Sequence, residues 1–184
     1  MPEGGYKIRN QHETHFVTFG VVEWVDVFTR VDYKHLYLER IKHSQREDGL
    51  LLHAWVLMSN HFHAVMTAKE DTSLSAILRD LKKYSAVNII QAIEKNEHES
   101  RREWMLDIFR QAGNENSRNS KYQFWRQDNH PKECNSKAFT MQKIDYIHNN
   151  PVRAEIVSKP EDYLYSSAID YANGKGLLEI DFIW

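Results

Sequence analysis

Two histidines, His61 and His63, lie in the middle of the most apolar segment of the chain, WVLMSNHFHAVMTA. Side chains of a β-strand alternate between its two faces, so this spacing puts both imidazoles on one face and Phe62 on the other. Two neutral imidazoles so placed can bind one divalent metal ion, which normally takes a third ligand from elsewhere in the chain. The alternative is a pair of histidines that only hydrogen-bond to their neighbours.

A later segment, DYIHNNPVRAEIV, supplies a candidate for the third ligand. Tyr146 and Asn150 stand four residues apart, hence on one face of a helix, with His148 pointing elsewhere. A phenol one turn from a carboxamide oxygen, facing a two-histidine metal site, is suited to attack on a phosphodiester: the metal polarises the phosphate and the phenol oxygen forms a covalent phosphotyrosine. The alternative for Tyr146 is a core aromatic ring whose hydroxyl lies at the rim.

Tyr84 is a second candidate nucleophile, because the segment RDLKKYS surrounds it with Arg79, Lys82 and Lys83. Cations favour the phenolate, and they also bind phosphate. Asn88 is the one ligand-like residue a turn further on, which makes Tyr84 the weaker candidate. The three cations are predicted to contact DNA; the alternative is an ordinary solvated helix face.

A basic stretch between the two motifs joins Trp125 with Arg118, Lys121 and Arg126. Cations interleaved with aromatic rings suit contacts to the backbone and bases of a single strand. The alternative is a solvated loop beside a core tryptophan. Formal net charge is −2, so the total charge does not indicate a nucleic-acid partner and a local patch must provide the binding surface.

Two further histidines, His15 and His130, are left out of the predicted metal site. Histidines in a strand or a turn are more often hydrogen-bonded to neighbours than bound to metal. The single cysteine, Cys134, excludes an internal disulfide and a cysteine-based zinc knuckle.

Composition favours one globular domain over residues 1–184, with a C-terminal tail from about residue 159 packing on it. The chain is 41% hydrophobic and 27% charged, which argues against disorder. No apolar run approaches the ~20 residues of a membrane helix, and the first residues lack the apolar core of a signal peptide. We therefore expect a cytoplasmic protein that does not enter a membrane.

Hydrophobic periodicity predicts an α+β fold. Residues rich in β-branched and aromatic side chains indicate strands at 14–24, 51–59, 61–68 and 122–127. Apolar residues at three- and four-residue spacing indicate helices at 31–49, 71–96, 100–113 and 136–150, with a short helix or turn at 159–176. Thr72 or Ser73 is the expected N-cap of the longest helix. This order is typical of a central antiparallel sheet with helices packed on it, close to the split β-α-β or ferredoxin-like plan.

The segments MSNHFHAVM and YIHNNPVRAEIV, in this order and spacing, resemble the two motifs of the HUH single-tyrosine (IS200-like) transposases. The second resembles the tyrosine helix of the REP-associated tyrosine transposase branch. The resemblance runs from Phe16 through the segment KPEDYLYSSA, so it covers most of the chain.

This resemblance implies a metal-dependent endonuclease and strand transferase that acts on hairpin-bearing single-stranded DNA without ATP. By matching positions, His61 and His63 would hold Mg²⁺ or Mn²⁺, and Tyr146 would attack the scissile phosphate to leave a 5′-phosphotyrosine and a free 3′ hydroxyl. The insertion-sequence branch has a glutamine one turn after the tyrosine, where this chain has Asn150, one methylene shorter; a water would then bridge it to the metal. A homodimer and a nucleoid-associated location are also implied.

Two other functions stay open from the sequence. One is a catalytically silent regulator that only binds hairpin or single-stranded DNA. The other is a histidine–metal hydrolase of phosphodiesters, with water in place of tyrosine as the nucleophile.

Overall fold

The computed structural model describes residues 8–116, 121–127 and 131–183. Within these residues the chain forms one antiparallel sheet, in the strand order β2-β3-β1-β4. Its strands are β1 (His15–Gly20), β2 (Leu50–Leu57), β3 (His61–Ala68) and β4 (Lys132–Glu133). The predicted α+β fold with a central antiparallel sheet is confirmed, as is the hairpin between the second and third strands.

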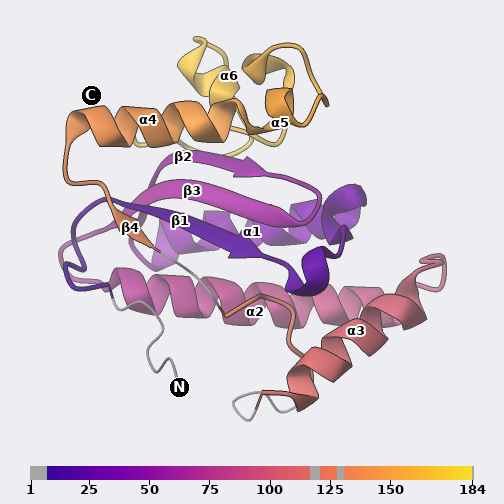
Figure 1. The fold of residues 1–184 in the computed structure, drawn as a ribbon. Coiled ribbons are helices and arrows are strands. Elements are labelled where there is room, and N and C mark those ends of the chain that lie inside the picture. The colour runs from indigo at the N-terminus through magenta and orange to yellow at the C-terminus, as the bar shows by residue number, and fades with distance from the viewer. Residues whose placement is uncertain (1–7, 117–120, 128–130, 184) are drawn as a thin grey trace.

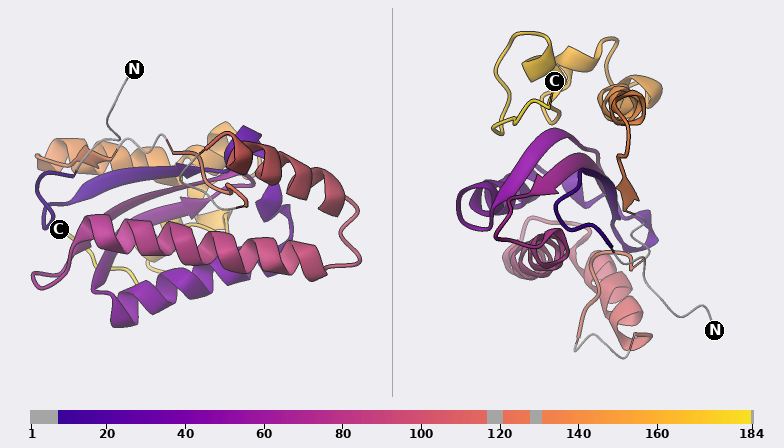
Figure 2. Two further views of the ribbon diagram at one scale, coloured as in Figure 1. Left: turned by 90° about the horizontal axis from the view of Figure 1, so that it is seen from below. Right: turned by 90° about the vertical axis from the view of Figure 1, so that its left-hand side faces the viewer.

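Helices cover both faces of the sheet (Figure 1). One face is covered by α1 (Val31–Glu47) and α2 (Leu74–Lys95), and α3 (Arg102–Asn114) follows α2. The opposite face is covered by α4 (Lys137–His148) (Figure 2). The short helix α5 (Asn150–Arg153) follows α4 after a break at Asn149. The short elements are the 3₁₀ helices η1 (Val22–Trp24), η2 (Val27–Thr29) and η3 (Pro160–Asp162), and α6 (Ala168–Tyr171).

Local signals in the sequence explain the helix ends. The Ser73 side chain accepts a hydrogen bond from the backbone N–H of Ala76, which makes it the N-cap of α2. Gly49 ends the turn after α1 with φ +76°, a conformation that disfavours any residue with a Cβ. Among the described residues, no helix is long and apolar enough to cross a membrane.

The sheet separates two apolar clusters. Even-numbered residues of β3, such as Phe62 and Met66, pack with α1 and α2 in the larger cluster. Val65, on the other face of β3, packs with Ile144 and Ile147 of α4 in a smaller one. The alternation of the strands therefore decides which side chains α4 faces.

The predicted strand at residues 122–127 is wrong. This segment contributes an isolated bridge between Trp125 and Val21, while the fourth strand is the two-residue β4. Phe124 and Trp125 are both buried, so the segment has no alternation between an inner and an outer face. The first strand also ends earlier than predicted, at Gly20, because the chain turns into η1.

The C-terminal segment lies along β2, the outermost strand on that side of the sheet. The backbone N–H of Leu57 donates to Tyr165 O at 2.9 Å, and the N–H of Asp181 donates to Leu52 O at 2.8 Å. The Tyr163 hydroxyl also donates to Leu57 O at 2.8 Å. Backbone groups that a sheet edge would otherwise expose are therefore paired within the chain.

Candidate functional site

His61 and His63 lie on the face of β3 that α4 covers, as the sequence predicted. Their ring centroids are 4.8 Å apart. Across the ladder with β1, His61 is opposite Gly20 and His63 is opposite Thr18. The strand alternation and the antiparallel register thus bring two imidazoles, a small hydroxyl and a residue without a side chain to one patch of the sheet.

The hydrogen bonds around His61 assign its tautomer. The Asn60 amide nitrogen donates to Trp24 O at 3.1 Å, which turns the Asn60 carbonyl oxygen toward His61 Nδ1 at 2.7 Å. Because that oxygen only accepts, Nδ1 carries the proton and Nε2 keeps its lone pair. This is the tautomer in which Nε2 can ligate a metal, and Asn60 holds it.

His63 is the more buried of the two, with 6% of its surface exposed. Its Nδ1 lies 2.8 Å from Thr18 Oγ1, and its ring stacks on Phe16 with 5.5 Å between centroids. Burial lowers the pKa of His63 to about 3, with the charges of His61 and Lys143 lowering it further. Burial also lowers the pKa of His61, and the Asn150 side chain, as an acceptor for the protonated ring, partly offsets this effect. Both imidazoles are therefore neutral at pH 7, as metal ligation requires.

Tyr146 comes to the same patch from α4. Its ring meets the His63 ring edge-on with 5.3 Å between centroids, and it meets Phe16 edge-on at 6.0 Å. The buried neighbours Ile144 and Ile147 anchor the helix on the sheet, which leaves the partly exposed Tyr146 at the edge of the contact. No hydrogen bond to its hydroxyl occurs within the described residues, so the oxygen is available for another partner.

Asn150 completes the patch. It lies one turn after Tyr146, across the break at Asn149, and its side chain lies near enough to His61 to raise the pKa of that imidazole. Pro151, in the first turn of α5, accounts for this break, because it has no N–H to donate to the carbonyl of Ile147 and its ring clashes with that carbonyl in a continuous helix. His148 points elsewhere, as predicted: its Nε2 lies 2.9 Å from Ser167 Oγ in the interior.

Two cations near Tyr146 were not predicted. Lys143 Nζ lies 5.9 Å from the centre of the Tyr146 ring, and the Arg153 guanidinium lies 5.2 Å from it. Neither cation forms an ion pair with a carboxylate in the described part of the chain. Lys143, Tyr146, Asn150 and Arg153 follow the spacing i, i+3, i+7 and i+10, which is one face of a helix. That spacing was the available signal in the sequence.

These side chains form a donor set that fits a divalent metal. The set consists of two imidazole nitrogens and one amide oxygen; in the residues described, no group of three or more His, Cys, Asp or Glu side chains could hold a metal ion. A metal here would keep open positions for water or a phosphate oxygen.

Residues 9–110, more than half of the chain, match the family model described as "Transposase IS200 like". The chain belongs to the IS200-like transposase family. This is a family of DNA-cleaving enzymes, so the protein is an enzyme of that class. The matched region contains both histidines and ends before α4. No curated protein sequence gives a significant match.

Two solved structures align with this chain. A REP-associated tyrosine transposase bound to a REP hairpin aligns with a TM-score of 0.66 and 19% identity, over 100% of this chain and 92% of that one. At this identity the likeness shows the shared fold. A protein from Deinococcus radiodurans assigned as a transposase aligns with a TM-score of 0.44 and 18% identity, over 81% of this chain and 97% of that one.

In this IS200-like fold the rival nucleophile, Tyr84, lies on the wrong side of the sheet. It projects from α2, whose buried residues Leu78 and Leu81 pack in the cluster that contains Phe62. Its exposed ring contacts Arg40 and Lys83. The sheet therefore separates Tyr84 from the two imidazoles.

The cations predicted on α2 are also on that side. Arg79 pairs with the neighbouring Asp80, and Lys82 donates to Arg126 O at 2.7 Å. Lys83 lies 5.5 Å from the Tyr84 ring. The structure does not bring these three cations next to the histidine pair.

The basic stretch divides into different environments. Arg118, like His130, lies outside the described residues. Lys121 pairs with Glu94 at 3.4 Å. Trp125 is 4% exposed and its indole N–H donates to Ser85 Oγ, so the predicted stacking of a base on Trp125 is wrong; this ring fills the core.

Arg126 is the member of this stretch that approaches the site. Its guanidinium lies 4.9 Å from the Trp24 ring, and that ring meets His61 edge-on at 6.1 Å. No pattern in the sequence singled out Trp24. His15, left out of the predicted site, is buried and its Nδ1 contacts Glu13 O at 2.7 Å.

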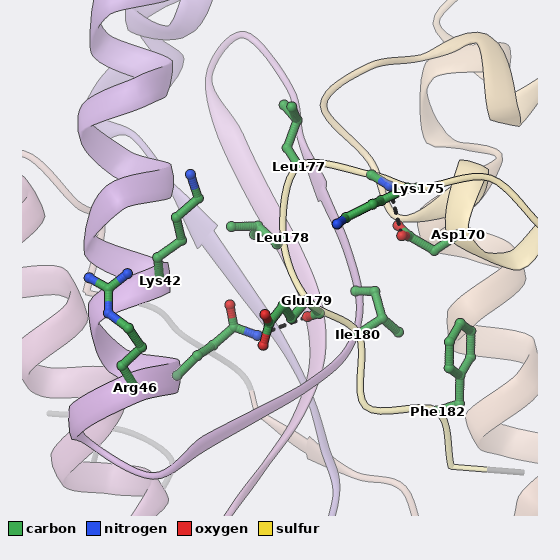
Figure 3. A pocket seen from close by; sticks show the side chains of 11 residues that line it. Lys42, Arg46, Asp170, Lys175, Leu177, Leu178, Glu179, Ile180 and Phe182 are labelled. Atoms are coloured by element: carbon green, nitrogen blue, oxygen red, sulfur yellow. Dashed lines mark hydrogen bonds between the residues drawn. The ribbon is translucent and has the colours of Figure 1, made fainter.

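A separate groove lies between α1 and the C-terminal segment (Figure 3). Lys42 and Arg46 of α1 line one side, and Lys175 and Ile180 line the other. None of the predicted site residues that the structure describes lines this groove.

Proposed function

We propose that this IS200-like transposase is a metal-dependent endonuclease and strand transferase for single-stranded DNA, with Tyr146 as the nucleophile. One observation carries the proposal: the Tyr146 ring lies 5.3 Å from the His63 ring, on the face of the sheet that also holds His61. A phenol and a neutral imidazole pair from distant parts of the sequence thus meet at one place.

In the proposed step, the Tyr146 phenol oxygen attacks the scissile phosphorus and the bond from phosphorus to the 3′ oxygen breaks. The phenol proton passes to solvent, and the leaving 3′ oxygen takes up a proton. The products are a 5′-phosphotyrosine and a free 3′ hydroxyl. The phosphotyrosine bond retains the free energy of the cleaved phosphodiester bond. Attack by a 3′ hydroxyl on the phosphotyrosine therefore reverses the step without ATP.

The chain's own residues prepare this attack. Lys143 and Arg153 flank the Tyr146 ring, where their positive charge attracts the phosphate of the DNA. Asn60 and Thr18 fix the two imidazoles through their Nδ1 atoms. Mg²⁺ or Mn²⁺, bound by His61, His63 and, directly or through water, Asn150, would neutralise charge that develops on the phosphate.

The substrate we propose is hairpin-bearing single-stranded DNA, and the REP-associated branch is the proposed placement within the family. The support is the resemblance of YIHNNPVRAEIV to that branch and the similarity in fold to a REP-associated transposase bound to a REP hairpin. Contacts from Arg79, Lys82, Lys83, Lys121 and Arg126 to this DNA stay a prediction. A DNA substrate would place the protein at the nucleoid in the cytoplasm.

We further propose that residues 1–184 act as one catalytic domain. All side chains of the proposed site come from a single chain, so a homodimer, although implied by the resemblance, is not needed to assemble it. Pairing of β2 with the C-terminal segment also occupies an edge that a second sheet would use.

A covalent-adduct assay tests the nucleophile. The protein is incubated with end-labelled hairpin DNA carrying single-stranded flanks, in Mn²⁺ or Mg²⁺, and separated on a denaturing gel. We expect a labelled protein band that disappears in Tyr146→Phe and persists in Tyr84→Phe, the matched control on the other side of the sheet. His61→Ala should abolish the band and leave DNA affinity almost unchanged, because phosphate contacts carry most of that affinity.

Two outcomes contradict this mechanism and identify the other functions. DNA binding without any adduct or cleavage indicates a regulator. Cleavage that survives both Tyr146→Phe and Tyr84→Phe indicates a hydrolase in which water is the nucleophile.

A further inference from the structure

Trp24 is an exposed aromatic residue between two buried valines. Its neighbours Val22 and Val25 are almost completely buried, whereas 50% of the Trp24 surface is exposed. Its indole N–H has no hydrogen-bond partner within the described residues. By contrast, the N–H of the core residue Trp125 donates to Ser85 Oγ. Trp24 therefore lacks both the burial and the N–H hydrogen bond of a core tryptophan.

The backbone that presents Trp24 is strained. Glu23 and Trp24 have φ +50° and +55°, two consecutive residues in the left-handed region. A Cβ atom is disfavoured there, and such residues persist only where the surroundings hold them and often mark a functional position. Glycine would adopt this conformation more easily, so stability alone does not explain a tryptophan at this position.

The strained turn holds the indole against the metal site. Its ring meets His61 edge-on at 6.1 Å, and the Arg126 guanidinium lies over it at 4.9 Å. Gly20 makes this close approach possible: a Cβ at Gly20 would lie 3.1 Å from Arg126 Cδ and 3.4 Å from the Trp24 ring. The Trp24 carbonyl also receives the Asn60 hydrogen bond that orients His61.

We infer that Trp24 is a stacking platform for an unpaired base of the single-stranded DNA, next to the phosphate held at the histidine pair. The inference rests on the proposed function for the substrate and adds a binding residue to it. Single-strand binding sites combine cations for the backbone with exposed aromatic rings for the bases, and Arg126 and Trp24 form such a pair. Successive nucleotides rise about 3.4 Å, so a ring 6.1 Å from His61 corresponds to a base one or two positions from the scissile phosphate.

Photocrosslinking tests this contact without requiring cleavage. Hairpin DNA with single-stranded flanks is synthesised with 5-iodouracil at one flank position at a time, and bound to the Tyr146→Phe variant. We expect a crosslink that peptide mass spectrometry maps to Trp24, from one or two flank positions only. Crosslinks from every position, or none at Trp24, would overturn the inference.

Affinity measurements provide the second readout. Trp24→Gly removes the ring and relieves the left-handed strain, so we expect unchanged thermal stability. Its affinity for the same hairpin DNA should be about 5- to 150-fold lower, the range for losing one base–aromatic stack. Trp24→Phe should keep most of the affinity. The salt dependence of binding should be unchanged, because no phosphate contact is lost.

Trp104→Ala is the matched control, since Trp104 is similarly exposed, at 54%, on α3. It should leave affinity unchanged. Equal affinity of the wild type and Trp24→Gly would refute the platform, and altered sedimentation of Trp24→Gly without DNA would instead assign Trp24 to self-association. A missing covalent adduct in the wild type refutes the proposed function, while the crosslink still reports on Trp24.

Discussion

Replacing Thr18 with valine should weaken metal binding at a distance from the metal. Thr18 Oγ1 lies 2.8 Å from Nδ1 of the buried His63. Ligation through Nε2 requires a proton on Nδ1, and the hydroxyl is the acceptor for that proton. Valine has nearly the same shape as threonine, so the change removes the hydrogen bond and little else.

The magnitude follows from the burial of His63. A buried donor left without a partner costs about 1–3 kcal/mol, which corresponds to roughly 5- to 150-fold in a binding constant. In the metal-free protein, Thr18→Val removes part of the same hydrogen bond. Metal affinity reports only the difference between the metal-bound and metal-free states, so its loss lies toward the lower end of this range. We therefore expect about tenfold weaker Mn²⁺ binding, in agreement with the usual effect of losing a partner of a ligating histidine.

Calorimetric titration with Mn²⁺, and urea unfolding in the presence of a chelator, measure the two quantities. Thr67→Val is the control, because Thr67 lies on the same face of β3 as His63 and its Oγ1 contacts another histidine, with 2.7 Å to His53 Nε2, as well as Thr14 Oγ1 at 2.9 Å. It should lower the free energy of unfolding at least as much as Thr18→Val does and leave Mn²⁺ affinity unchanged. Equal Mn²⁺ affinity of Thr18→Val and the wild type would refute the assignment of Nε2 of His63 as a ligand.

Two further predictions concern charge. Burial raises the pKa of Glu99, but hydrogen bonds and charges from Arg101 and Arg30 outweigh it and lower the pKa to about 2. The resulting stability is present above pH 4.5 and is lost as the pH falls toward 2. In urea unfolding, the free energy of unfolding of Glu99→Gln should therefore be about 3 kcal/mol below that of the wild type at pH 7, and the two should become equal near pH 2. A difference that does not change with pH would contradict this reasoning. The Lys143 charge, about 6 Å from the Tyr146 ring, contributes roughly 1–2 kcal/mol of electrostatic stabilisation to the attack at this partly exposed site. Lys143→Met should therefore slow adduct formation about tenfold at pH 7 in a timed gel assay. An unchanged rate would exclude this role for Lys143.

Most of the fold could be predicted from local patterns. The helix over residues 31–47 and the hairpin strands at 50–57 and 61–68 have clear periodicity and end at recognisable signals such as Gly49. The segment 122–127 could not be predicted in this way. Its aromatic residues indicate a strand, but they fill a gap between α3 and the end of β1, and such packing depends on elements distant in the sequence.

The candidate site was likewise predictable only where it depends on local spacing. Spacing alone put His61 beside His63, and Tyr146 beside Asn150, because the periods of strand and helix are fixed by backbone geometry. Spacing could not show that the two pairs meet, nor that Tyr84 is separated from the histidines by the sheet, because the choice of face depends on how α2 and α4 pack.

The sequence by itself therefore determined which residues share a face, since that follows from local dihedral angles. The tertiary structure decided which faces meet, which is set by burial of apolar surface across the whole chain. It also decided which residues contact the two histidines, which no periodicity in the sequence predicts. Thr18 reaches His63 through strand register, and Trp24 reaches His61 through a strained turn. Both contacts join residues about 40 positions apart, and long-range packing alone creates them.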